Sequence, residues 1–273
     1  TVGDETLKPQ DPETPDPNAK VDYPSPEVAP NVWNTSVKAS AAEELNSRFE
    51  ADGLWYKVTG ADTVQLIKNP NVANAYSASY PEAPAELVIP ETVTNAATGK
   101  TYTVTTIGYQ AFYMTSQLTK VTLPDTIRVI GDFAFQVSWG TPKITELNLP
   151  EGLEEIGAYA LYNIPVDFKL PSTLKRIGEN AFSFSGITEV HFGPNIEAVE
   201  KRAFSFCQKL TKAEVIPQIQ DTEGLYLDCT ALSDVTVADG VERLPENCFF
   251  GCAKLTQITL PASVTELGKS VFY

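Results

Sequence analysis

Residues 118–135 read LTKVTLPDTIRVIGDFAF, and this phrase returns in altered form along most of the chain. Its most regular part is an aliphatic residue and a glycine, followed after two residues by a small residue and an aromatic one. Copies of that part begin at Ile107, Ile130, Ile156 and Ile177, and worn copies, two of which lack the glycine, begin at Val199, Leu244 and Leu267. Successive copies are 23, 26, 21, 22, 45 and 23 residues apart. A repeat of this length is typical of supersecondary units that stack on one another, and it argues against a single globular core.

The first half of the phrase predicts a strand in each repeat. Val121 and Leu123 alternate with polar residues, which is the period of a half-buried strand, and Pro124 removes a backbone donor and ends the strand. Ile127 and Ile130 then predict a second short extended piece before the glycine and a helical turn. No such coil can bury its apolar row alone, so the coils must stack. The sequence therefore predicts a β-rich solenoid of about eight coils with short helical turns.

The first 85 residues do not repeat. Residues 1–30 carry seven Asp or Glu against two Lys, together with seven Pro, so they predict a disordered, extended tether; the alternative is a disordered end with no spacer role. Residues 31–85 are predicted to cap the solenoid, because residues 54–58 and 64–66 alternate around a turn and indicate a β-hairpin over the first coil. Residues 86–273 are assigned to the coils.

Three places depart from the regular repeat. Polar loops are inserted around residues 95–100 and 136–143, and the coil at residues 216–224 has Asp221 where an aliphatic residue is expected. We expect a local bulge in that coil. Trp139 lies on the second inserted loop, where it either contacts a ligand or folds back over the edge of a coil.

The charge of the chain restricts its partners. A net charge of −15 argues against nucleic acid and against an anionic membrane surface, both of which need clustered Lys and Arg. No apolar run approaches the length of a membrane span, and the chain starts at Thr1 without Met, so we expect any membrane anchor to lie upstream. His191 is the only histidine and has no evident nucleophile to pair with, so we expect no enzyme, no catalytic residue and no cofactor.

The complete phrase resembles the BspA-like, or Treponema-type, leucine-rich repeat of gut Bacteroidetes surface proteins. Residues 118–135 and 255–272 match it well, and the segment at residues 49–58 is similar to the hairpin that precedes such repeats. The resemblance implies a leucine-rich-repeat solenoid with an N-terminal β-hairpin cap. It also implies a secreted or lipid-anchored protein of the cell surface or outer membrane, and an adhesion role toward host or bacterial extracellular proteins. It carries no catalytic residue over to this chain and does not identify the ligand.

Strand alternation places two rows of polar side chains on the exposed face of the coils, and we call these rows the strip. The residues before the central aliphatic position are Lys120, Glu146, Asp167, Glu189, Lys212, Asp234 and Gln257. The residues after it are Thr122, Asn148, Lys169, His191, Glu214, Thr236 and Thr259. A flat surface of mixed sign suits a protein or peptide partner, although exposed sheet positions are polar for solubility alone.

Two other ligand classes are weighed against a protein partner. Glu146, Asp167 and Glu189 are suitable ligands for Ca²⁺, but no calcium-loop motif is present, so we expect no metal. A surface glycan is the alternative ligand, and it requires exposed aromatic side chains near Trp139, Tyr109 or Tyr113.

Two further sets of residues recur at one position of the repeat. Cys207, Cys229 and Cys252 are 22 and 23 residues apart, so they are predicted to form a row of buried free thiols, with a disulfide among them as the alternative. A second set of residues, predicted to form a spine of aromatic side chains inside the solenoid, is Phe112, Phe135, Phe182, Phe204 and Phe249.

Overall fold

The computed structural model describes residues 44–72, 78–137 and 142–273, which fall within one compact unit, residues 39–273. The predicted tether, residues 1–30, and Trp139 lie outside the described residues. The predicted domain boundaries at residues 30 and 85 stay predictions. Within the described residues, no helix is long and apolar enough to cross a membrane.

The N-terminal cap is a small antiparallel sheet. It is made of β1 (Arg48–Ala51), β2 (Leu54–Val58) and β3 (Thr63–Ile67), and the β2–β3 hairpin confirms the predicted one. Alternate residues of β2 and β3 are buried, because one face of this sheet covers the core and the other is open to solvent. β3 pairs in parallel with β6 (Lys100–Ile107), so the hairpin continues directly into the first coil.

The first insertion adds a strand, which the sequence did not predict. β5 (Thr92–Asn95) pairs antiparallel with β6, and the turn between them contains Gly99 with a positive φ of 72°. Asn95 stabilises this turn by accepting a hydrogen bond from the backbone of Ala97 (3.0 Å). The polar loop expected around residues 95–100 is thus the turn of a β-hairpin, and the sequence missed the strand β5 that precedes it.

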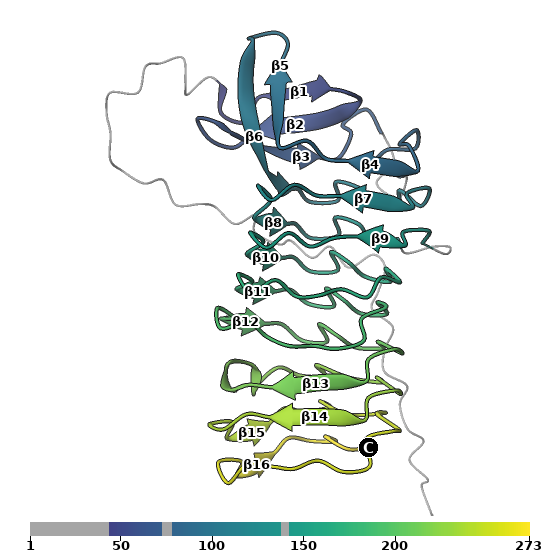
Figure 1. Ribbon diagram of the computed structural model, residues 1–273, viewed down its shortest axis with the longest axis vertical. Helices are drawn as coiled ribbons and strands as arrows, with labels where there is room; N and C mark the ends of the chain where they lie inside the picture. The colour runs from purple at the N-terminus through teal and green to yellow at the C-terminus, as the bar shows by residue number, and fades with distance from the viewer. Residues whose placement is uncertain (1–43, 73–77, 138–141) are drawn as a thin grey trace, which may run out of the picture. The chain divides into compact units, whose positions relative to one another are not determined.

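Two parallel ladders run along the solenoid (Figure 1). The strands of the first are β4 (Glu86–Val88), β7 (Lys120–Thr122) and β9 (Glu146–Leu147), and it continues farther along as β13 (Lys212–Val215) and β14 (Asp234–Val237). The second starts at β6 and comprises β8 (Val129–Ile130), β10 (Glu155–Ile156), β11 (Arg176–Ile177) and β12 (Ala198–Val199). A separate pair, β15 (Arg243–Leu244) and β16 (Glu266–Leu267), follows. The chain is a leucine-rich-repeat solenoid, as predicted.

The register of the second ladder reproduces the repeat of the sequence. Ile107, Ile130, Ile156, Ile177 and Val199 pair with one another in that order, so the aliphatic residue of each repeat lies beside its counterparts. Between β12 and β15 the irregular coil contains a 3₁₀ helix, Pro217–Ile219, at the place of the short strand. This break agrees with the local bulge predicted there.

The predicted helical turns consist of successive tight turns. In most coils two residues of this segment, four apart, have a positive φ, as in Gln110 (52°) with Met114 (56°) and Asn180 (52°) with Phe184 (60°). The amide of Phe182 donates to the carbonyl of Ala203 in the next coil (2.8 Å), so this side of the solenoid is also hydrogen-bonded from coil to coil. Every side of a coil is thus fixed by its neighbours.

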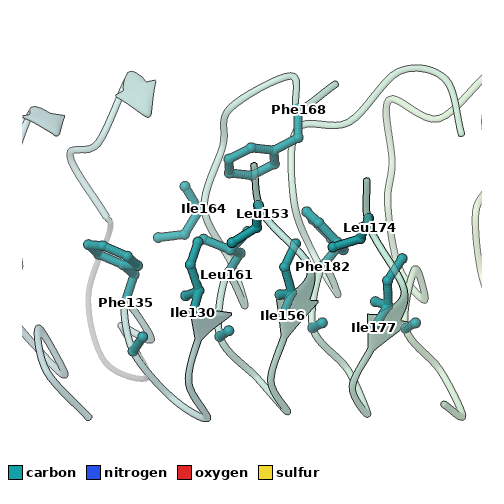
Figure 2. Close-up of a cluster of buried hydrophobic side chains, with 14 of the residues drawn as sticks. Ile130, Phe135, Leu153, Ile156, Leu161, Ile164, Phe168, Leu174, Ile177 and Phe182 are labelled. Atoms are coloured by element: carbon teal, nitrogen blue, oxygen red, sulfur yellow. The ribbon is translucent and has the colours of Figure 1, made fainter. Parts of the chain in front are cut away.

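The core is a column of identical positions, as Figure 2 shows for its central coils. The predicted aromatic spine is confirmed: its five phenylalanines are at most 2% exposed. Ring centroids lie 5.2 Å apart both for Phe112 and Phe135 and for Phe182 and Phe204. In the coil between Phe135 and Phe182, Leu161 takes the place of the aromatic ring (Figure 2).

The cysteines of the repeat are buried free thiols. Each donates a hydrogen bond to a backbone carbonyl of the preceding coil: Cys207 to Phe182 (3.1 Å), Cys229 to Phe204 (3.1 Å) and Cys252 to Tyr226 (3.2 Å). Burial raises the pKa of Cys252 to about 12 and that of Cys229 well above its usual value. The thiols therefore serve as buried hydrogen-bond donors between coils.

We expect these thiols to resist alkylation in the folded protein. Because the thiolate is the reactive form and Cys207, Cys229 and Cys248 are fully buried, iodoacetamide at pH 8 should leave them unmodified while Cys252, 8% exposed, reacts slowly. Mass spectrometry counts the adducts. The reference is the protein alkylated in denaturant without a reducing agent. That reference should take up four adducts, one for each cysteine. Only two adducts in it would show a disulfide.

Candidate functional site

The strand pairing places much of the first row of the strip in register. Lys120 pairs with Glu146 across β7 and β9, Glu189 forms an isolated bridge with Lys212, and Lys212 pairs with Asp234 across β13 and β14. Asp167 and Gln257 belong to no strand, so the structure does not extend this register to them. The row is therefore continuous in two pieces, one in the early coils and one in the later ones.

The charges of the strip largely compensate one another. Lys120 Nζ lies 2.6 Å from Glu146 Oε2, Lys212 Nζ lies 3.4 Å from Glu189 Oε1, and the hydrogen bond to Glu146 raises the pKa of Lys120. Exposed ion pairs of this kind are worth only about 0–1 kcal/mol, so a partner can exchange them for its own charges at small cost. The strip thus carries charges of both signs, several of them paired with one another.

Three members of the strip hold neighbouring coils together. The amide of Asn148 accepts from the backbone N–H of Leu123 (3.1 Å) and donates to the carbonyl of the same residue (3.2 Å). Asp167 accepts hydrogen bonds from the N–H (2.9 Å) and the hydroxyl (3.0 Å) of Thr188. Glu214 accepts from the backbone N–H of Phe192.

Asp167 and Glu214 act between β9 and β13, where the pairing of the first ladder lapses. Asn148 acts just beyond the paired residues of β7 and β9. These side chains provide acceptors that adjacent strands otherwise supply. We therefore remove Asn148, Asp167 and Glu214 from the candidate binding residues. This role could not be predicted from the sequence, because alternation predicts which side chains are exposed and not where strand pairing stops.

His191 lies between two carboxylates. Its Nε2 is 3.6 Å from Glu189 Oε2, its Nδ1 is 3.9 Å from Glu214 Oε2, and its side chain is 68% exposed. Among the described residues, no Ser, Thr or Cys side chain hydrogen-bonds to this imidazole. The arrangement suits a surface ion pair and lacks the nucleophile of a catalytic triad.

The three carboxylates weighed as calcium ligands each have other partners. Glu146 pairs with Lys120, Glu189 with Lys212, and Asp167 with Thr188. In the part of the chain that the structure describes, no group of three His, Cys, Asp or Glu is placed to hold a metal ion.

The structure reveals a second surface, on the turn side of the coils, that the sequence did not predict. We call it the outer aromatic row, and its members are Tyr109, Phe133, Tyr159, Tyr162, Phe184 and Phe206. Phe133 and Tyr159 stack with centroids 5.2 Å apart, and Phe184 and Phe206 with centroids 4.6 Å apart. In these two pairs the ring faces cover one another, whereas the ring of Tyr162 lies at 45° to that of Tyr159 and at 61° to that of Phe184.

The backbone of this row is unfavourable for aromatic residues. Phe133, Tyr159, Phe184 and Phe206 have φ between 55° and 60°, a region where bulky side chains are uncommon. Stacking between coils, worth about 0.5–1.5 kcal/mol for each aromatic pair, offsets part of that strain. The signal in the sequence was weak, because the aromatic residues change position within the repeat between Tyr159 and Phe184.

The aromatic residues considered for glycan binding have different surroundings. Tyr109 is 61% exposed, whereas Tyr113 is buried, with Lys68 Nζ 5.9 Å from its ring centroid. Only Tyr109 of this pair is therefore available to a ligand. The place of Trp139 beside them is a prediction on residues outside the described part.

Comparison with solved structures supports the fold. A leucine-rich repeat protein from Bacteroides ovatus is 28% identical, with a TM-score of 0.64, over 81% of this chain and 55% of that one. A leucine rich cell surface protein from Faecalibacterium prausnitzii is 26% identical, with a TM-score of 0.51, over 83% of this chain and 52% of that one. The T. pallidum leucine rich repeat protein, 22% identical with a TM-score of 0.61 over 77% of this chain and 91% of that one, shares the fold.

The chain thus spans about half the length of the first and second of these proteins. No significant match was found among curated proteins. The family model of the BspA type leucine rich repeat region matches residues 100–166 and 166–273, in 6 copies. With most of its coils matched in this way, the chain belongs to the BspA-type leucine-rich repeat family.

Proposed function

We propose that this chain is a non-enzymatic recognition and adhesion protein of the bacterial cell surface, which binds an extracellular protein or peptide through the strip. The observation that carries the proposal is the later part of the strip, where polar side chains of both signs are exposed over consecutive coils. The members of this part are His191, Lys212, Asp234, Thr236, Gln257 and Thr259. None of them has the coil-to-coil backbone role of Asn148, Asp167 or Glu214.

The chemistry of this surface favours a protein partner over a small molecule. Lys212 and Asp234 lie directly opposite each other on paired strands, and Thr236 lies beside Glu214 on the same pair. Such a surface can match an alternating pattern of charges and hydrogen-bonding groups on a partner, which contributes mainly to specificity and to the association rate. In the outer aromatic row, by contrast, Phe133 with Tyr159 and Phe184 with Phe206 stack face to face, which leaves these rings less open to a sugar.

The proposed location follows from the family and its neighbours. The F. prausnitzii protein is described as a cell surface protein, and repeats of this family form the matched coils here. We place the chain at the cell surface, attached to the outer membrane by a lipid or secreted. Surface proteolysis of intact cells, followed by metabolic lipid labelling of the full-length protein, tests the two parts of this assignment.

The strip is tested with a charge reversal and a matched control. We expect Lys212→Glu to weaken binding to an extracellular protein partner at least tenfold, because it reverses a charge within the strip. Lys201→Glu is the control: Lys201 is 54% exposed and 3.5 Å from Glu179, closely matching Lys212, which is 52% exposed and 3.4 Å from Glu189, but it lies off the strip. Partners are first selected by pull-down from defined host and bacterial extracellular proteins, and affinities are then measured by surface plasmon resonance.

The control variant should bind within twofold of the unmodified chain. Equal affinity of both variants for a captured partner contradicts the assignment to the strip. Binding to a glycan array with no protein captured contradicts the proposed class of partner.

A further inference from the structure

A shallow cleft of about 320 Å³ lies on the cap. Its walls include residues of β1, β2 and β3, the segment that follows β3, and the start of the first turn region. The side chains that matter for its chemistry are Arg48, Lys57, Gln65, Lys68, Asn69 and Tyr109. The volume is at the lower end of the range of about 300–1,000 Å³ that small-molecule sites occupy.

Three cations line this cleft in a chain whose net charge is −15. Two of these cations are neighbours: Arg48 pairs with Lys57 across β1 and β2. Lys57 in turn pairs with the neutral Gln65 across β2 and β3, so Arg48, Lys57 and Gln65 lie side by side on the solvent face of the cap. Like charges placed directly opposite on paired strands destabilise a sheet. This arrangement therefore has a cost that the fold itself does not explain.

No carboxylate of the described chain neutralises this pair of cations. Neither Arg48 nor Lys57 has an Asp or Glu oxygen within ion-pair distance among the described residues, and Glu50, on the same face of β1, makes no such pair either. Lysines farther along, such as Lys100 and Lys175, lie 2.8 and 2.7 Å from a glutamate. The cleft thus keeps a local positive charge in an acidic molecule.

The cleft also holds neutral groups that can recognise a polar ring. Asn69 Oδ1 accepts the backbone N–H of Asn71 (2.9 Å), which orients the amide and leaves its Nδ2 hydrogens to donate elsewhere. Tyr109 is 61% exposed and its ring meets that of Phe133 at 79°, and among the described residues no ring stacks parallel to it. Amide donors beside an open aromatic ring can contact the hydroxyl groups and the apolar face of a sugar.

We propose that this cleft binds an acidic sugar, with its carboxylate or sulfate group between Arg48 and Lys57 and its ring against Tyr109. The guanidinium of Arg48 can form two parallel hydrogen bonds to such an anion, and charge-assisted bonds of this kind are stronger than neutral ones. Gln65 and Asn69 then donate to the hydroxyl groups. The site is separate from the strip and does not depend on the proposed protein partner.

The ligand class is tested with small probes on the intact chain. D-Glucuronate and D-glucose 6-sulfate are titrated against ¹⁵N-labelled protein, with neutral D-glucose, acetate and inorganic sulfate as comparisons, while the side-chain amide signals of Gln65 and Asn69 are followed. We expect at least one acidic sugar to shift these signals and to bind at least tenfold more tightly than glucose and than its own bare anion. Bare anions that bind as tightly as the acidic sugars would overturn the assignment of a sugar, and so would the absence of any shift.

Substitutions then locate the site. Arg48→Gln and Lys57→Gln should each weaken binding of the acidic sugar at least tenfold, and Tyr109→Ala about fivefold. Lys57→Gln should leave the thermal unfolding midpoint unchanged or raise it, because it removes a repulsion between opposed cations. Lys201→Gln, at an exposed lysine away from the cleft, should change nothing.

Retention of affinity within twofold in both Arg48→Gln and Lys57→Gln would overturn the proposed site. Neither substitution should affect a protein partner bound at the strip. The failure of one proposal can therefore be told from the failure of the other.

Discussion

Phe182→Ala is expected to lower the free energy of unfolding by about 3–5 kcal/mol, the range for truncating a buried aromatic side chain. Phe182 is fully buried, and its ring lies 5.2 Å from that of Phe204 and 5.4 Å from that of Phe168, measured between centroids. Figure 2 shows it in the row that contains Phe135 and Leu161, with Phe168 on the side toward the strip. Each coil supplies one side chain at this level, and the coil spacing is fixed by hydrogen bonds, so the neighbours cannot collapse into the vacated space.

The natural control for this substitution lies two residues away. Phe184 belongs to the outer aromatic row, is 44% exposed and stacks on Phe206 with centroids 4.6 Å apart. Phe184→Ala should cost about 0.5–1.5 kcal/mol, the value of one exposed aromatic pair. Urea denaturation followed by circular dichroism measures both. Equal losses in the two variants would refute the assignment of Phe182 to the core and Phe184 to the surface.

The sequence predicted the interior of the solenoid well because identical positions lie beside one another. Ile107, Ile130, Ile156 and Ile177 recur at one phase of the repeat, and the structure pairs them in the same order. A residue that recurs at one position of the repeat is flanked by the equivalent residue of the preceding coil and by that of the following coil. Its environment can thus be read from the period alone.

The features that the sequence did not predict depend on contacts outside the period. The hydroxyl of Tyr80 donates to the carbonyl of Ile67 and accepts the backbone N–H of Trp55 (3.0 Å), which ties the cap together across segments with no common repeat. The strand β5 likewise comes from an insertion. In both cases the partner is far along the chain or in an irregular stretch, so the repeat pattern does not predict the contact.

The candidate site shows the same division. Alternation correctly indicated that Lys212 and Asp234 are exposed neighbours, because both lie on regular strands. It could not show that the carboxylate of Asp167 is engaged by Thr188, since that depends on where strand pairing lapses. The cleft on the cap was also missed, because Arg48 and Lys57 come together only through the register of the hairpin.

Gly157, Gly178 and Gly268 are expected to tolerate no side chain, although their backbone does not require glycine. A Cβ at Gly178 would lie 2.5 Å from the amide nitrogen of Ala158 and 2.6 Å from the carbonyl carbon of Gly157, both in the preceding coil. These are backbone atoms, and Gly178 N–H donates to the carbonyl of Ile156 (2.8 Å), so the coils cannot separate without losing hydrogen bonds. Gly178→Ala should therefore cost about 3 kcal/mol, the upper end of typical overpacking.

Gly99 provides the opposite case, because it requires a left-handed backbone but has space around it. Its φ is 72°, and nothing lies within 4 Å of an added Cβ. Gly99→Ala should cost about 1–2 kcal/mol through backbone strain, and Gly99→Asn less, because Asn tolerates this conformation. At Gly178 the order should be reversed, since the larger side chain of Asn increases the clash with the preceding coil.

Urea denaturation of the four variants at positions 99 and 178 distinguishes the two causes. If Gly178→Asn were no less stable than Gly178→Ala, close approach of the coils would not be the reason for this glycine. The same contact recurs at Gly157, whose Cβ would lie 2.5 Å from the amide nitrogen of Asp132. At Gly157, Gly178 and Gly268, backbone contact with the preceding coil thus limits the rise between coils. The copies with Glu200 or Pro245 at this position accommodate a side chain there, so this limit does not apply to every coil.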